Sequence, residues 1–286
     1  MIIEELGERT KKDLRNYFGD RDFVVVAVPK EEPACLYVVR ATRCVESARR
    51  IHPLQPPDVE VLGKALLGAL LLTSLIKHAT DQKVLLKLDS SEATVVAEAD
   101  GRGRVRGFVE RTQTQRQGTL SVTKELGMGT PYTSIVPLIS NDVGENLSYY
   151  FSQSEQIPSA LSVGVLFSGD GSVKHAGGFL LQTFGGTSEK VSQLLNHRIK
   201  AVGPITEMME KGMRPEDVAV LLLEDLKPHL VVLKEVEYFC PCDERIARSS
   251  LSFLSKEELS EILLEGPAEV VCRFCRRVYR FGEKDL

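Results

Sequence analysis

Tryptophan is absent from this 286-residue chain, and aromatic residues make up only 6% of it. The chain therefore has no tryptophan-based surface on which bases or ligands might stack. A basic excess is also missing, because the formal net charge is −4. That charge argues against a general nucleic-acid-binding protein, which needs a positive surface for phosphates. With 43% hydrophobic and 27% charged residues, the composition is that of an ordinary folded globular protein.

Long hydrophobic runs are lacking as well. The longest apolar stretch, residues 65–76, has a lysine on either side and is too short to cross a bilayer, so we expect a buried helix there. The N-terminus, Met1-Ile2-Ile3-Glu4-Glu5, turns acidic early and has no hydrophobic signal-peptide region. These features predict a cytoplasmic protein without a membrane partner, in a compartment where thiols stay reduced.

The signatures of common enzymes are missing too. Gly101-x-Gly103 and Gly127-x-Gly129 lack the strand and helix that flank a dinucleotide-binding loop, and no Walker lysine follows them, so we interpret both as turns. The five histidines are scattered without metal-binding spacing, and there is no Gly-x-Ser-x-Gly nucleophile elbow. We therefore predict no catalytic residue and a protein that is not an enzyme.

The first part of the chain, residues 1–185, predicts an α/β body with antiparallel sheets. Period-two patterns and turn residues indicate strands at 24–28, 36–39, 84–88, 94–99, 105–109, 119–124, 133–138, 162–167 and 175–183. Helices are expected at 43–51, 58–77 and 141–154. Asp100-Gly101-Arg102-Gly103 and Gly169-Asp170-Gly171 have the composition of hairpin turns. The whole chain is thus predicted to be of the α+β class.

Gly185-Gly186 ends this pattern, and residues 186–234 are predicted to form a linker of short helices. Three of the five methionines lie there, at Met208, Met209 and Met213. Methionine suits surfaces that repack against varied partners, although ordinary helix packing explains it equally well. Residues 235–286 then form a small C-terminal domain, with a helix expected at 255–264.

Four of the six cysteines lie in this small domain, as Cys240-Pro241-Cys242 and Cys272-Arg273-Phe274-Cys275, with 29 residues between the pairs. Two close pairs at such a separation can place four sulfurs around one zinc ion. Each pair can also close on itself as a disulfide and release the metal. Two unrelated pairs and two permanent disulfides remain as alternatives, the latter disfavoured because such small loops stabilise little. Isolated Cys35 and Cys44 are expected to be packing residues.

A basic cluster surrounds the second pair. Its members are Arg273, Arg276, Arg277 and Arg280. Such a cluster favours a zinc ribbon that binds nucleic acid, but residues 240–286 hold 8 basic and 9 acidic residues, a net charge of 8 − 9 = −1. We interpret the cluster as a solvated face beside an acidic helix.

These residues resemble the heat-shock protein 33 family. The resemblance rests on the two cysteine pairs, the following Tyr279-Arg280-Phe281, and a separate segment that begins Tyr149-Tyr150-Phe151 and continues through Ser154-Glu155-Gln156-Ile157-Pro158-Ser159-Ala160. Further matches are Thr130-Pro131-Tyr132, Val136-Pro137-Leu138 and Ala176-Gly177-Gly178-Phe179. The match covers the chain from about Asp58 onward. Pro241 inside the first pair and Arg276, where glycine or asparagine is frequent, depart from the family pattern.

The resemblance implies a redox-regulated chaperone that holds unfolding proteins without ATP during heat and oxidative stress. Cys240, Cys242, Cys272 and Cys275 would bind one zinc ion per chain when reduced. Oxidation would form the disulfides Cys240–Cys242 and Cys272–Cys275, release zinc and unfold the linker, with a homodimer as the active form. The partners would be unfolded client proteins. A zinc-ribbon nucleic-acid-binding regulator and an enzyme with a structural zinc remain as alternatives from other classes.

Overall fold

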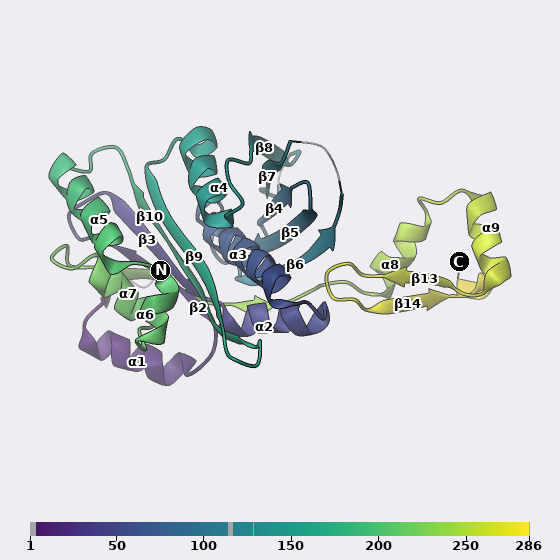
Figure 1. Ribbon diagram of the computed structural model, residues 1–286, viewed down its shortest axis with the longest axis horizontal. Helices are drawn as coiled ribbons and strands as arrows, with labels where there is room; N and C mark the ends of the chain where they lie inside the picture. Colours follow the sequence, from purple (N-terminus) through teal and green to yellow (C-terminus); the bar gives the residue numbers. More distant parts are fainter. Residues whose placement is uncertain (1–3, 114–116, 128, 286) are drawn as a thin grey trace. The chain divides into compact units, whose positions relative to one another are not determined.

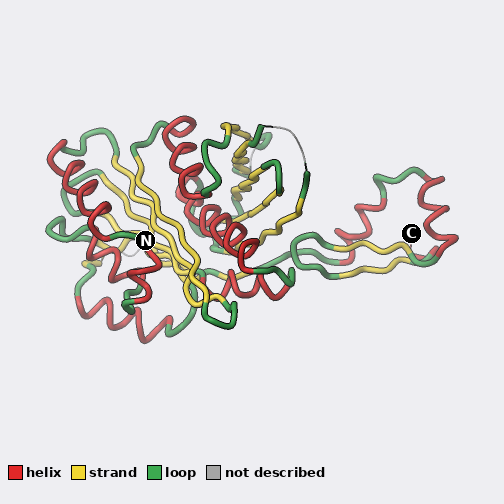
Figure 2. The backbone as a smooth tube through the Cα atoms, in the orientation of Figure 1, coloured by secondary structure: helices red, strands yellow, loops and turns green. Residues whose placement is uncertain are grey.

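The computed structural model describes residues 4–113, 117–127 and 129–285, so residues 1–3 and Met128 from the segments discussed above lie outside it. The chain folds as two compact units, Met1–Tyr238 and Phe239–Leu286. Figure 1 shows helices packed on both faces of a long twisted sheet in the first unit, and Figure 2 separates its helices from its strands by colour. In the described part of the chain, no helix is long and apolar enough to cross a membrane.

The first sheet of unit one has six strands, and every neighbouring pair is antiparallel. Its order is β1 (Glu4–Glu5), β11 (His229–Glu235), β2 (Phe23–Val28), β3 (Ala34–Arg40), β10 (Val173–Thr183) and β9 (Ser159–Phe167). The predicted pairing of the first two β-rich runs is confirmed, as is the hairpin around Gly169-Asp170-Gly171. The central strands read as continuous apolar runs because both of their faces are buried.

The second sheet has six strands of its own. Its order is β12 (Glu237–Tyr238), β6 (Arg104–Arg111), β5 (Ala93–Asp100), β4 (Lys83–Asp89), β7 (Thr119–Glu125) and β8 (Tyr132–Pro137). The predicted turn between β5 and β6 is present, and Gly103 adopts φ +93° there, a conformation that other residues adopt at a cost. One face of β4 is buried and the other half-exposed, which matches its period-two pattern.

Helix α3 (Pro56–Leu72) lies between the two sheets, with α2 (Thr42–Ile51) and α4 (Val143–Tyr150) beside it (Figure 1). The helix predicted over 58–77 is therefore shorter than expected. The Thr73 hydroxyl donates to the carbonyl oxygen of Leu70 at 2.6 Å, a 3₁₀ turn follows over Thr73–Leu75, and Ile76 is extended. Helix α4 is capped by Asp142, and it widens into a π-helical turn at Phe151–Glu155 instead of continuing regularly.

Four helices cover the opposite face of the first sheet (Figure 1). They are α1 (Glu8–Phe18), α5 (Glu189–Val202), α6 (Ile205–Glu210) and α7 (Pro215–Leu222). The short helices predicted within residues 186–234 are present as α5, α6 and α7, with Ser188 as the cap of α5. The expectation of short helices throughout residues 186–234 is wrong at its end, because residues 229–235 form β11 between β1 and β2. Pro228 blocks a preceding helical turn, and the apolar run Leu230-Val231-Val232-Leu233 after it satisfies its backbone by strand pairing.

The second unit is small. It contains α8 (Glu244–Leu251), α9 (Lys256–Glu265), β13 (Ala268–Val271), β14 (Val278–Phe281) and a short 3₁₀ turn (Glu283–Asp285). The helix predicted at 255–264 is confirmed as α9, and a capping box between Ser255 and Glu258 begins it. Helix α8 was not predicted. Its hydrophobic cluster has four buried members, Ala247, Leu251, Ala268 and Phe281. Such a core is too small to stabilise a domain of this size by itself.

Candidate metal centre

The second unit brings all four C-terminal cysteines together. The Sγ atoms of Cys240, Cys242, Cys272 and Cys275 lie within 4.8 Å of one another, and each side chain is partly exposed. Two short distances join the pairs: Cys240 Sγ to Cys272 Sγ is 3.7 Å, and Cys242 Sγ to Cys275 Sγ is 3.2 Å. The cluster therefore combines one sulfur pair from before α8 with one from the turn between β13 and β14.

The turn that carries the second pair has a defined geometry. The Cys272 amide donates to the Arg277 carbonyl at 2.9 Å, which extends the β13–β14 ladder, and the Arg276 amide donates to the Cys272 carbonyl at 2.8 Å. Arg276 adopts φ +59°, the left-handed region that favours glycine and asparagine. Position 276, where the sequence departs from the family pattern, therefore holds an arginine in a strained backbone conformation that glycine or asparagine adopts without cost.

The spacing of the sulfurs fits a tetrahedral zinc ion. Zinc–thiolate bonds of about 2.3 Å place the sulfurs of a regular tetrahedron about 3.8 Å apart. The observed upper bound of 4.8 Å and the two short contacts bracket that value, so small rotations of the side chains suffice to bind the ion. Four thiolates close the coordination sphere, which is typical of structural rather than catalytic zinc.

The electrostatics of the cluster also favour a cation. Burial raises the pKa of the Cys275 thiol, and hydrogen bonds with Cys242 and Cys272 and the charge of Cys240 raise it further. Thiols packed this closely resist ionising together unless a positive ion lies between them. Metal binding would therefore release protons from this site.

Tyr279 on β14 reaches across to the first pair. Its Oη donates to the carbonyl oxygen of Cys242 at 3.0 Å and to the Sγ of the same residue at 3.2 Å. In the sequence, Tyr279 is recognisable only as part of a family motif, and no local pattern assigns it to the site. Its hydrogen bond joins residues 37 positions apart, so only the fold could reveal it.

The other two cysteines lie in the core of the first unit, as predicted. Cys35 on β3 and Cys44 on α2 are buried among hydrophobic residues. Burial raises the pKa of Cys35 to about 11 and that of Cys44 still further, with the charge of Asp22 adding to the second shift. Thiols of this kind stay protonated and react slowly.

The arginines of the second unit lie on its surface. Arg280 pairs with Glu269 across the β13–β14 hairpin, with 2.7 Å between Nε and Oε1, and Arg277 donates to the Tyr279 hydroxyl at 3.5 Å. Arg273, Arg276, Arg277 and Arg280 are all exposed. The predicted exposure of this face is confirmed, and the acidic partner of Arg280 lies on β13.

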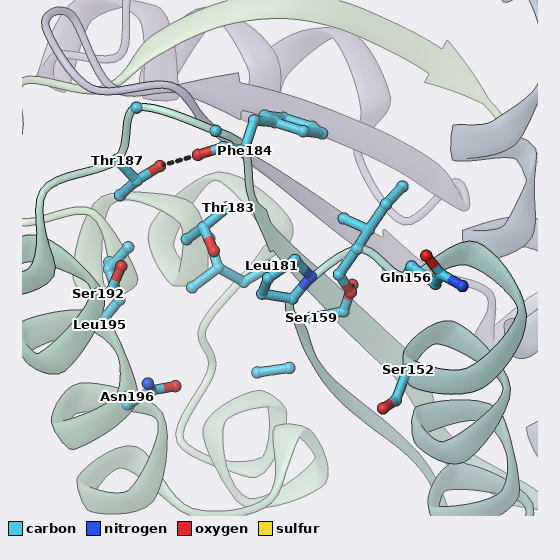
Figure 3. A pocket seen from close by; sticks show the side chains of 15 residues that line it. Ser152, Gln156, Ser159, Leu181, Thr183, Phe184, Thr187, Ser192, Leu195 and Asn196 are labelled. Atoms are coloured by element: carbon cyan, nitrogen blue, oxygen red, sulfur yellow. Dashed lines mark hydrogen bonds between the residues drawn. The ribbon is translucent and has the colours of Figure 1, made fainter.

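A cavity of about 940 Å³ in the first unit lies between the π-helical turn and α5, with the ends of β9 and β10 as its floor (Figure 3). Its polar lining consists of hydroxyl and amide side chains, among them Ser152, Gln156 and Asn196. None of its lining residues is charged, a histidine or a cysteine, so its hydroxyl groups have no general base beside them in the lining.

Comparison with known proteins agrees with the site. The family model described as "Hsp33 protein" matches residues 22–282. The "33 kDa chaperonin" of Aquifex aeolicus is 56% identical, covering 98% of this chain and 93% of the relative, and that of Bacillus subtilis is 30% identical, covering 93% and 97%. The crystal structure of the 33 kDa chaperonin (heat shock protein 33 homolog) from Thermotoga maritima superimposes with a TM-score of 0.82 at 32% identity, covering 93% of this chain and 96% of that one. The chain belongs to the Hsp33 family.

Proposed function

We propose that this protein is a redox-regulated chaperone that holds unfolding proteins without ATP. Its relatives carry the name chaperonin, and the convergence of four thiols on one point is the observation that carries the redox part of the proposal. In this reading the cysteines sense the oxidant and no residue is catalytic. The reducing cytosol is the compartment in which such thiols remain ready to bind metal.

In the reduced state, Cys240, Cys242, Cys272 and Cys275 would hold one zinc ion as thiolates. Zinc supplies binding energy that the four-residue core of the second unit lacks, on the order of 10–16 kcal/mol in zinc-finger peptides. We propose that oxidation forms the disulfides Cys240–Cys242 and Cys272–Cys275, as the family resemblance implies. Zinc then leaves, and the second unit, residues 239–286, loses most of its folding energy.

The linker, residues 186–234, is the element that would respond next. Its helices bury an apolar face of the first sheet that includes Phe23, Val25, Leu36, Val38, Phe179 and Leu181. From the linker side, Leu195, Ile205, Met208, Met209, Val218 and Leu222 complete this second core. If the helices α5, α6 and α7 detach while β11 stays in the sheet, both sets become exposed together. We propose that this surface of the body, residues 1–185, binds unfolded clients.

The helix α6 is held close to the sheet by two glycines that face it. A Cβ atom at Gly177 would lie 2.5 Å from Sδ of Met209, and one at Gly164 would lie 2.8 Å from Cγ2 of Thr206. Close docking of this kind depends on exact shape and has no covalent anchor, which suits a segment that must dissociate and return. The active form is proposed to be a homodimer, as in the family.

The proposal is tested by following zinc and activity in one sample. The reduced protein is treated with hydrogen peroxide at mild heat, zinc release is read with a chromogenic chelator, and light scattering reports aggregation of a heat-sensitive client. Release of one zinc per chain together with gain of anti-aggregation activity, both reversed by a thiol reductant and zinc, is the expected result. Release without any gain of activity would leave the zinc site as merely structural.

A further inference from the structure

Tyr279 holds one of the four sulfurs by a hydrogen bond that nothing in the proposed switch uses. It lies on β14 opposite Val270, and its ring packs beside the small hydrophobic cluster of the second unit. The Nη1 atom of Arg277 donates to its Oη at 3.5 Å, which leaves the phenol proton for Cys242. The two acceptors on Cys242, its carbonyl oxygen at 3.0 Å and its Sγ at 3.2 Å, share that proton.

A donor at this distance changes the chemistry of a metal-bound thiolate. A hydrogen bond withdraws charge from the sulfur, so the thiolate becomes a weaker nucleophile while the bonded form is stabilised. Groups that bond to metal ligands in this way commonly alter metal affinity by about 10–100-fold when removed. The contact to the carbonyl oxygen adds a second effect, because it fixes the backbone of the Cys-Pro-Cys segment and with it the direction of the sulfur.

We propose that Tyr279 is a positioning residue that keeps Cys242 bound to zinc and slows its reaction with hydroperoxides, so that it sets the oxidant threshold of the site. This inference rests on the proposed function for its biological meaning, although its effect on zinc binding does not.

The restrained step is the attack of the Cys242 sulfur on a peroxide oxygen. The O–O bond breaks, hydroxide leaves with the electron pair and takes a proton from the buffer, and Cys242 becomes a sulfenic acid. The Cys240 thiolate then displaces a second hydroxide, which also takes a proton from the buffer, and the disulfide forms. The two sulfurs lose two electrons in total, and the peroxide is reduced to two molecules of water.

The test compares Tyr279→Phe, which keeps the ring and removes the hydroxyl, with the wild-type full chain. The matched control is Tyr238→Phe, which removes a phenol that donates to the Gly107 carbonyl at 3.0 Å in the first unit. Zinc affinity is measured by chelator competition without oxidant, and thiol loss and zinc release are followed under excess hydrogen peroxide. We expect Tyr279→Phe to weaken zinc binding about tenfold and to accelerate release several-fold, with the control unchanged.

A second variant guards against a folding defect. A chain in which position 279 alone carries 3-fluorotyrosine keeps the size of the side chain and strengthens the donor, so zinc release at pH 7 should become slower than in the wild type. Unchanged affinity and release in both variants would reduce Tyr279 to a packing role. Slower release by Tyr279→Phe would instead identify the phenol as the proton donor to the leaving hydroxide, and would overturn the proposal. A wild type that loses zinc but holds no client refutes the proposed function and leaves these comparisons intact.

Discussion

Truncating Ile205 at the start of α6 should activate the reduced protein without any oxidant. Ile205 is 1% exposed, and an added Cβ at Gly177 would lie 3.4 Å from its Cγ1 atom, so its side chain fills the space between the linker and the sheet. Replacing a buried isoleucine by alanine costs about 2–5 kcal/mol. The cost falls on the docked state of the linker, because the detached linker exposes this side chain to water in any case.

The size of the effect follows from that figure. A loss of about 3 kcal/mol raises the population of the detached linker roughly a hundredfold. We expect Ile205→Ala to suppress client aggregation while its zinc remains bound, and its α5–α7 amides to exchange with deuterium faster than those of the wild type. Chelator assay, light scattering and exchange are measured on the same reduced sample.

Leu70→Ala is the matched control for this prediction. Leu70 is also 1% exposed, but it lies on α3 in the core on the other side of the sheet. It should lower the overall stability by a similar amount without loosening the linker selectively. If Ile205→Ala accelerates exchange in the linker and yet holds no client, the surface under the linker is not the binding site. If both variants gain activity equally, general destabilisation explains the result.

Three further predictions follow from the described residues. Burial raises the pKa of Asp22 to about 6, so the folded state retains a proton that the unfolded state loses near pH 4; this contribution to stability is full below about pH 4 and is lost as pH rises to about 6. Asp22→Asn should remove that pH dependence and increase the free energy of unfolding by about 2–3 kcal/mol at pH 7, as measured in urea titrations. The asparagine oxygen can still accept the hydrogen bond that the Cys44 amide donates to Asp22 Oδ2 at 2.8 Å in the wild type. An equal gain at pH 4 and pH 7 would contradict the raised pKa of Asp22. Arg276→Gly should relieve the backbone strain at φ +59° and stabilise the zinc-loaded second unit by about 1 kcal/mol, which is measured as a higher melting temperature. Arg273→Gly is the control, and equal melting temperatures for the two variants would refute the claim that Arg276 is strained. Cys272→Ser should lower zinc content to near zero and unfold the second unit, as seen in proteolysis, whereas Cys35→Ser should leave zinc content unchanged; zinc retained by Cys272→Ser would exclude that residue as a ligand.

Much of this fold and of the site follows from local sequence patterns. The pairing of 24–28 with 36–39, the hairpin around Gly169-Asp170-Gly171 and the cap at Asp142 rest on residues close together in the chain. Turn chemistry, capping and period-two patterns act over a few residues and can be read without the fold. The four cysteines could also be recognised from the sequence alone, because paired thiols at this spacing have few uses other than metal binding or redox chemistry.

Tertiary structure alone decided where the remaining elements lie. Residues 229–235 follow three helices along the chain, yet they form β11, because the gap between β1 and β2 offers partners for their backbone groups. The same holds for Tyr279, whose hydroxyl meets Cys242 only after the β13–β14 hairpin has formed. Both depend on contacts between distant parts of the chain, and the geometry of such contacts is set by packing rather than by neighbouring residues. The sequence by itself thus identified four sulfur atoms that could hold a metal ion, and the fold decided that they meet, what surrounds them and which surface the helices α5–α7 cover.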